Sequence, residues 1–362
     1  MQIDFHHAVT YVVSRLAGLG HDDASVVAHA SQYVDDATQD GALEFTTGER
    51  YVRVTSSHKT INIALNADKA DNRLVWVPFH FMPGNEAPPP GASPDDAFYY
   101  RLMCKPGSRI ARDMMRDCVE RKHLHFGLHR LGIALHTFVD TWAHQQFIGA
   151  VCDINKVKTY AVNPDPSYCK DVVYGALTGV KEAFERHIAN FLPVGHAGAL
   201  TLPDLPFLKW SFTRENGEVV ARDNPTDYLK AAHAAFNVVR RFVAGDPDLA
   251  EVALPAGDAQ TLDTMLRTTL YIEGERRHQV WLQAIADGAF SFGPTSLSYV
   301  EQGPGSWKMD ALNQDPLDEA GVQYSFTPGF LGSNWKMFHD AVQFQRLYVL
   351  HELLPAYGIC AS

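Results

Sequence analysis

One segment of the chain combines helical spacing with an unusual number of metal-binding side chains. Between His125 and His144 the sequence reads HFGLHRLGIALHTFVDTWAH, with apolar residues at most of the intervening positions. At about 100° per residue, five polar side chains of this segment fall on one stripe roughly 100° wide. They are His125, His129, His136, Asp140 and His144. The pattern predicts a helix buried on nearly all sides, whose polar groups need partners.

Metal ions are the simplest partners for three of these side chains. His136, Asp140 and His144 follow one another at intervals of four residues, so a helix spreads them over roughly 12 Å. That span suits ligands shared among two or three ions better than one closed tetrahedral site, and zinc prefers this mixture of imidazole and carboxylate. His125 and His129 lie further up the helix, where we expect them to orient ligands or to pack in the core.

The composition is that of an ordinary globular protein with an acidic surface. The chain has 362 residues, 46% of them hydrophobic and 20% charged, and its formal net charge is −11. Lys and Arg form isolated pairs and no longer run, so we expect no extended nucleic-acid binding. The five cysteines are odd in number and form no CxxC motif, which indicates neither a disulfide framework nor a zinc ribbon.

No targeting or membrane-spanning segment is visible in the sequence. The start, MQIDFHHAVTYVV, has neither the basic region nor the apolar core of a signal peptide, and no apolar run reaches about 18 residues. We therefore expect a protein that is cytoplasmic, or exported without a cleaved signal peptide, with at most peripheral membrane contact. The oligomeric state is left open.

The remaining patterns predict a mainly α fold. The runs YVRVT (51–55) and LVWVPFHF (74–81) are the convincing strand-like segments, and 83–96 is a loop rich in Pro and Gly. No internal repeat or domain linker is visible, so we expect one helical domain over 1–362, with its candidate ligands in 1–205 and a helical extension over 226–362. Helices are expected at 6–17, 22–33, 107–122, 170–191, 226–244, 259–288 and 333–354.

Other segments offer further candidate ligands. They are Asp4 and His6 near the start, the adjacent Asp35 and Asp36, His80, and the pair His196 and Asp204. Each has an ordinary structural explanation: a carboxylate can cap a helix or begin a turn, and a lone His is usually a satisfied core residue. Together, so many His and Asp residues in apolar settings point to a common site.

The order of these candidates resembles that of the zinc-dependent phospholipase C and P1/S1 nuclease superfamily. Those mainly helical proteins hold three zinc ions with an early His, an Asp, a second His, a helix bearing His-x-x-x-Asp followed by another His, and a last His with a downstream carboxylate. Over roughly residues 1–205 this chain offers His6, Asp35 or Asp36, His80, His136-x-x-x-Asp140, His144, His196 and Asp204 in that order. The resemblance implies a multi-helix domain of that fold with loop elaborations.

Three departures from the family pattern bear on the number of metals. The family binds zinc through the amino and carbonyl groups of an N-terminal Trp, whereas this chain starts Met1-Gln2-Ile3. His144 follows Asp140 by only four residues, and the final His-x-x-x-Glu/Asp is absent because Asp204 lies eight residues after His196. These differences leave open a site with fewer metals or with a different third position.

The resemblance implies a phospholipase C-like, zinc-dependent phosphodiester hydrolase that holds two or three ions and cleaves a phospholipid or another small phosphodiester. Metals at such a centre activate a water, and Asp35, Asp36 or Asp4 would orient or deprotonate it. A P1-like single-strand nuclease is the alternative within the family, and the acidic charge favours the lipid or small diester over nucleic acid.

Two alternatives lie outside the family. A helical protein with a purely structural zinc would use the same ligands without catalysis. The dipeptide His339-Asp340 raises an HD-type phosphohydrolase, but such a site needs a distant downstream Asp, and none follows Asp340.

Overall fold

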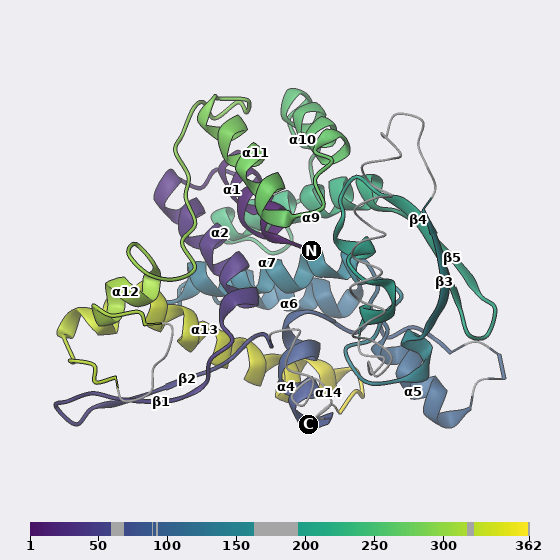
Figure 1. Cartoon of the computed structure of the whole chain (residues 1–362), viewed down its shortest axis with the longest axis horizontal. Coiled ribbons are helices and arrows are strands. Elements are labelled where there is room, and N and C mark those ends of the chain that lie inside the picture. The colour runs from purple at the N-terminus through teal and green to yellow at the C-terminus, as the bar shows by residue number, and fades with distance from the viewer. Residues whose placement is uncertain (59–68, 89, 92, 163–194, 317–321, 361–362) are drawn as a thin grey trace.

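A long buried helix runs through the middle of the molecule. The computed structural model describes the chain except for residues 59–68, 89, 92, 163–194, 317–321 and 361–362. Helix α7 (Gly127–Ala143) is central in Figure 1, and all its residues except Leu128 are buried. This confirms the prediction of a helix without a solvent face, although it starts after His125 and His144 caps its C-terminal end.

The helices around α7 supply most of the core. Helix α2 (His21–Asp36) packs along it most extensively, and α6 (Arg109–Glu120), α9 (Asn224–Ala244) and α13 (Asn334–Tyr348) also contact it. The close approach of α2 and α7 requires a glycine, because a Cβ at Gly132 would lie 2.4 Å from the carbonyl oxygen of Val27. Helix α2 is therefore held against the face of α7 that carries His136 and Asp140.

The N-terminal segment enters the centre of the molecule. A π-helical turn, η1 (Asp4–Val9), continues into α1 (Thr10–Leu16), and the chain turns at Gly18, whose φ is +105°. Helix α11 (Gly274–Ala286) packs against η1, and α10 (Ala256–Thr268) packs against α9. Residues from the start of the chain thus reach the polar stripe of α7.

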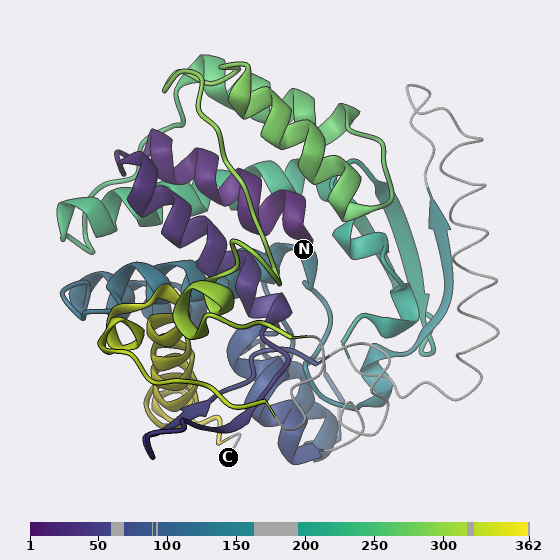
Figure 2. The same cartoon turned by 60° about the vertical axis from the view of Figure 1, so that its left-hand side comes forward.

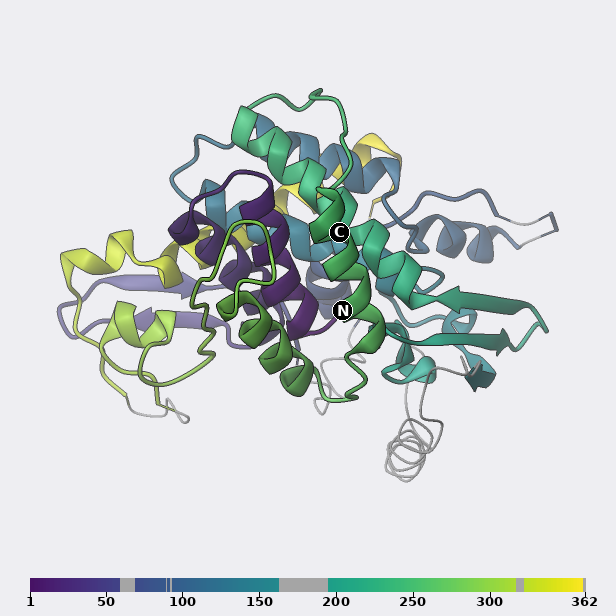
Figure 3. The ribbon, with the colours of Figure 1, turned by 90° about the horizontal axis from the view of Figure 1, so that it is seen from above.

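Two small antiparallel sheets flank the helices. Strands β1 (Gly41–Glu44) and β2 (Arg50–Arg53) form a hairpin, and β3 (Val157–Val162), β4 (Lys209–Arg214) and β5 (Val219–Asp223) pair in the order β3-β4-β5. The central strand β4 alternates burial as a strand with one covered face does. Figures 1 and 3 show the sheets at opposite ends of the helical body, and Figure 2 shows β3, β4 and β5 along one side of it.

Shorter elements complete the described chain. Helices α4 (Lys69–Phe79), α5 (Pro94–Leu102), α12 (Trp307–Leu312) and α14 (Leu354–Ala356) lie at the periphery in Figure 1. Helix α13 runs on through the π-helical turn η6 (Val349–Leu353). The single 3-10 turns are η2 (Asp153–Asn155), η3 (Ala197–Ala199), η4 (Leu202–Asp204) and η5 (Pro328–Gly332).

The mainly α class is confirmed, with two corrections to the elements. The run LVWVPFHF is not a strand but lies mostly in the last turns of α4, because a short apolar run fits a buried helix as well as a strand. The single helix expected over 259–288 is wrong, since α10 ends at Thr268 and α11 begins at Gly274. The helix expected at 170–191 lies outside the described residues. Among the described helices, none combines the length and apolar character needed to cross a bilayer.

Candidate metal centre

Eight predicted ligands, spread over some 200 positions of the chain, meet in the structure as three neighbouring groups, two of which share His136. Within each group, one ligand atom of every residue lies within 4.8 Å of those of the others. The groups are His6, His136 and Asp140; Asp35, His80 and His136; and His144, His196 and Asp204.

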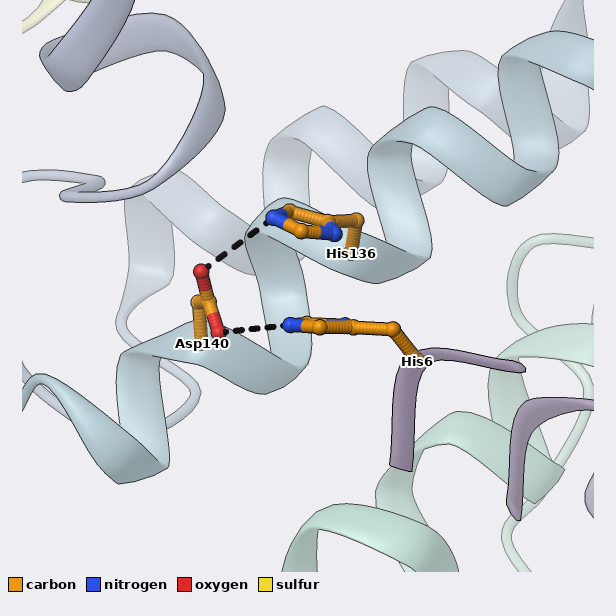
Figure 4. Close-up of side chains that lie close together, drawn as sticks. All are labelled: His6, His136 and Asp140. Atoms are coloured by element: carbon orange, nitrogen blue, oxygen red, sulfur yellow. Dashed lines mark ion pairs between the residues drawn. The ribbon is translucent and has the colours of Figure 1, made fainter. Parts of the chain in front are cut away.

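The first group joins η1 to α7. Figure 4 shows His6 and His136 with stacked rings, both turned toward the carboxylate of Asp140. His6 Nε2 lies 3.2 Å from Asp140 Oδ1, and His136 Nε2 lies 3.4 Å from Oδ2. The two imidazoles therefore approach opposite oxygens of one buried carboxylate, which is the arrangement of a bridging ligand.

The second group adds the end of α2 and the residue that follows α4. Asp35 Oδ1 lies 3.7 Å from His136 Nε2 and 3.8 Å from His80 Nδ1. The same His80 nitrogen lies 3.6 Å from Asp140 Oδ2, so this group shares His136 with the first and also contacts its Asp140. Because His80 follows the final turn of α4, the helical conformation of the LVWVPFHF run is what brings this side chain to the cluster.

The third group lies where α7 ends. His144 Nε2 is 3.8 Å from Asp204 Oδ1, and His196 Nε2 is 3.6 Å from Asp204 Oδ2. His144 Nδ1 lies 3.6 Å from Asp140 Oδ2, which connects this group to the other two. The turn η3 follows His196, and the turn η4 ends at Asp204. These two turns reverse the chain over eight residues, so that both side chains reach the same place.

In four of the imidazoles, one ring nitrogen forms a hydrogen bond with a backbone carbonyl oxygen. We call this the outer nitrogen and the other ring nitrogen the inner one. His136 Nδ1 lies 2.8 Å from the Ser31 carbonyl oxygen, and His144 Nδ1 lies 2.8 Å from that of His80. His196 Nδ1 is similarly placed toward Leu200, and His80 Nε2 toward Ser56, both at 2.9 Å. Because a carbonyl only accepts, each outer nitrogen must carry the proton and donate it, which leaves the inner nitrogen as a lone pair facing the cluster.

This arrangement leaves several polar atoms that a cation would satisfy. His136 Nε2 and His80 Nδ1 are 3.1 Å apart, so two lone pairs face each other unless a proton or metal lies beside them. Within the described part of the chain, both nitrogens of His6, Asp140 Oδ2 and Asp204 Oδ1 are buried without a hydrogen-bond partner. Buried polar atoms are rarely left in this state, and the donor set of imidazole and carboxylate therefore fits a metal centre.

The α-amino group of Met1 is the one positive group among the carboxylates. It donates to Asp140 Oδ1 at 2.6 Å and lies 3.2 Å from Asp204 Oδ1. Burial lowers the pKa of this amine, but the attraction of Asp140 and Asp204 outweighs burial and raises it to about 11. The sequence did not predict this contact, since Met1 differs from the N-terminal Trp of the phospholipase C superfamily.

The ionisation of the side chains also suits a metal centre. Burial opposes the charge of Asp140, but His144, the Met1 amine and His6 together hold the pKa of its carboxyl well below the usual range. Burial lowers the pKa of His6 to about 4 and that of His196 to about 4, so both imidazoles are neutral at pH 7, as metal ligands must be. Asp35 differs, because burial and the nearby Asp140 raise its pKa.

Some predicted site residues lie elsewhere. Asp4 does not join the cluster, because Arg277 Nε donates to its Oδ2 at 2.7 Å and Arg277 Nη2 to its Oδ1 at 3.2 Å. Asp36 turns away from Asp35, and its Oδ2 accepts from Gln32 Nε2 at 3.1 Å and from the Tyr299 hydroxyl. The structure thus gives no support to Asp4 as the group that activates water.

The remaining histidines of interest also lie outside the cluster. His125 is exposed, 3.6 Å from Asp340, and the buried His129 faces Asn334. His339 Nδ1 lies at the backbone of Val54, while Asp340 pairs with Lys336, so the HD dipeptide forms no joint site. No group of metal-binding side chains within the described residues includes this pair.

The cluster is partly open to solvent. Asp35 is 32% exposed and His196 20%, whereas Asp140 and His136 are at most 1% exposed. A cavity of about 890 Å³ has Asp35 in its wall, together with Thr201 from the segment between His196 and Asp204. A molecule in this cavity would reach the second group through Asp35.

Comparison with known proteins identifies a family whose function is unknown. A family model described as a family of unknown function (DUF6765) matches residues 1–353. No curated protein and no solved structure matches the chain.

Proposed function

This chain belongs to the family DUF6765, and we propose that it is a metal-dependent phosphodiester hydrolase, phospholipase C-like in its chemistry, with two or three zinc ions. The observation that carries the proposal is the sharing of ligands: Asp140 faces all three groups, and His136 belongs to two of them. Ligands shared in this way suit a polynuclear centre, which hydrolases of phosphate esters commonly use.

The opening of the cluster favours catalysis over a structural role. Structural zinc sites are closed by protein ligands, whereas catalytic sites keep a position accessible to water or substrate. Here the partly exposed Asp35 lies in the wall of the large cavity, His196 is also partly exposed, and the deeper ligands are sealed off. Metals held by these residues would polarise the phosphoryl group and lower the pKa of water.

The protein side chains would hold and orient what the metals activate. His80, His136, His144 and His196 are fixed in one tautomer by their backbone partners, so their inner nitrogens need no rearrangement to bind. We assign the orientation of water, and the acceptance of its proton, to the carboxylate of Asp35, because it alone joins the second group to the cavity wall. Asp36 lies in the same wall and could assist.

The likeness to the phospholipase C and P1/S1 nuclease superfamily is part of this proposal. It is supported by three groups of ligands in the expected order, including the third group that the sequence spacing had left open.

The experiment is a comparison of substrates on protein purified without chelator and of known metal content. We expect two or three zinc equivalents per chain and hydrolysis of bis(p-nitrophenyl) phosphate and of short-chain phospholipid, faster than single-stranded DNA at physiological salt. The matched control for site variants is Asp117→Asn. It removes a buried carboxylate of α6 that pairs with Arg130, a residue on another part of α7. A preference for single-stranded DNA would favour the P1-like alternative. Bound metal without turnover of any phosphoester would leave a structural zinc protein and overturn the proposal.

A further inference from the structure

The wall of the cavity beside Asp35 is acidic. Asp36, Glu273, Glu275 and Glu301 all line it, and no Lys or Arg occurs among the described residues that do so. Of these carboxylates, Glu273 lies 4.0 Å from Arg276. Glu275 and Glu301 form no ion pair with any residue in the described ranges. The potential in the cavity therefore favours a positive group and opposes a second phosphate.

A buried side-chain amide in the same wall has an oxygen that lacks a hydrogen-bond donor. Gln32 lines the cavity and is only 6% exposed. Its Nε2 donates to Asp36 Oδ2 at 3.1 Å, which fixes the orientation of the amide, since the carboxylate can only accept. Its Oε1 is left without a partner among the described residues, and a buried acceptor in that state is costly.

We propose that this cavity recognises a primary ammonium group on the substrate, placed between Gln32 Oε1 and the acidic wall while the phosphate faces Asp35 and the metal ligands. The inference rests on the proposed function. An N–H donor is essential to it, because Gln32 Oε1 can accept only from a group that carries a proton, and the carboxylates supply attraction for its charge. A quaternary ammonium would satisfy the charge but not the amide, and a neutral alkyl group would satisfy neither.

Matched soluble diesters test the order of preference. The three substrates are p-nitrophenyl 2-aminoethyl phosphate, its trimethylammonium analogue and p-nitrophenyl ethyl phosphate. A charge-assisted hydrogen bond of this kind predicts kcat/KM about tenfold higher for the amine than for the neutral diester, with the quaternary analogue between them. The same order in short-chain phospholipids with aminoethyl, trimethylammonium-ethyl and ethyl head groups would identify the source as a lipid, and its restriction to the soluble diesters would identify a small phosphodiester.

Two variants assign the preference to its residues. Gln32→Met removes the acceptor at similar volume, and Glu301→Gln removes one charge, so each should lower the ratio of kcat/KM for amine over neutral diester toward one. Glu251→Gln, at an exposed glutamate paired with Arg241 outside this cavity, is the control and should leave the ratio unchanged. A ratio that Gln32→Met and Glu301→Gln leave intact would overturn the assignment.

A binding measurement separates this inference from the proposed hydrolysis. The metal-loaded protein is titrated with 2-aminoethyl phosphate and with ethyl phosphate in a calorimeter. Tighter binding of the amine by about tenfold, lost in Gln32→Met, supports the inference even if no diester is cleaved. Equal binding of the two, or equal cleavage of the matched diesters, refutes it and leaves the proposed hydrolase standing.

Discussion

Asp140→Asn is the most informative single change, because this carboxylate contacts every part of the cluster. Its oxygens lie 2.6 Å from the Met1 amine, 3.2 Å from His6 Nε2 and 3.4 Å from His136 Nε2. His80 and His144 each approach to 3.6 Å. An asparagine keeps the shape but loses the charge, and its NH₂ group would point a donor at nitrogens or at cations.

The size of the effect follows from the burial of this charge. Removing one partner from a buried ion pair costs about 3–5 kcal/mol, and each 1.4 kcal/mol is a factor of ten in binding. We therefore expect metal affinity to fall by about 150- to 5,000-fold at the groups that Asp140 serves. In a wild-type protein with free metal at 100 times Kd, binding adds about 2.7 kcal/mol to the free energy of unfolding. In Asp140→Asn the same metal concentration would add about 0.3 kcal/mol or less.

The assay combines metal content with unfolding in urea, each with and without chelator. Wild type should lose stability on chelation, whereas Asp140→Asn should hold fewer ions and respond little to chelator. Asp117→Asn is the control. Like Asp140→Asn, it removes a buried carboxylate from its cation, here Arg130, but it touches no candidate ligand. It should lower stability by a similar amount and keep the wild-type metal content. Asp140→Asn with full metal content and a wild-type response to chelator would refute the metal centre.

Further predictions test the separate parts of the site. His144→Ala removes a ligand of the third group alone and should lower the metal content by about one ion and the activity by about 100-fold, measured by elemental analysis and initial rates; an unchanged metal content would contradict the grouping. Asp4→Asn breaks the pair with Arg277 and should cost about 3 kcal/mol of unfolding free energy but no metal, so loss of an ion would return Asp4 to the site. Acid should destabilise the chelator-treated protein, because burial holds the pKa of several non-ligand imidazoles far below the 6.5 of an unfolded chain. Since the unfolded state takes up these protons first, stability is complete above pH 6.5 and is lost as the pH falls, by about 2 kcal/mol per imidazole at pH 5. A melting temperature that stays flat from pH 7 to 5 would contradict this. The imidazoles and their folded pKa values are His29 at about 3, His129 at about 4, His278 at about 4 and His339 at about 3.

The helical part of the fold was predictable where the apolar period was regular. Helices α6 and α9 lie within a few residues of the expected ranges, the range 333–354 is divided between α13 and the π-helical turn η6, and the expected burial of α7 is confirmed. The period failed at LVWVPFHF, where all but one residue is apolar and Pro78 suggests an interruption. Pro78 lies in the last turn of α4, where it cannot donate to the Leu74 carbonyl, and the helix ends one residue later.

The sequence was enough to predict which His and Asp residues are candidate ligands, because they lie in apolar settings. It was not enough to predict where their side chains point. Asp35 and Asp36 are adjacent at the end of α2, about 100° apart around the helix, and only the packing of α2 on α7 decides which one faces His136. Asp4 was chosen for the same chemical reason as Asp35. Its ion pair comes from Arg277 on α11, which is 273 residues away in sequence, so no local pattern could reveal it.

The His196–Asp204 spacing departs from the pattern of the phospholipase C and P1/S1 nuclease superfamily, and one strained residue explains how the two side chains still meet. Leu200, between the two ligands, has φ 58° and ψ −139°, a conformation that a side chain other than glycine adopts only at a cost of about 1–3 kcal/mol. The cost is offset because the leucine side chain is buried and because its carbonyl oxygen accepts the hydrogen bond from His196 Nδ1 at 2.9 Å. The same backbone turn therefore reverses the chain toward Asp204 and fixes the tautomer of His196. A strict His-x-x-x-Glu/Asp helix would place both ligands without strain, so a strained turn at this point is itself an argument that His196 and Asp204 serve a common ligand.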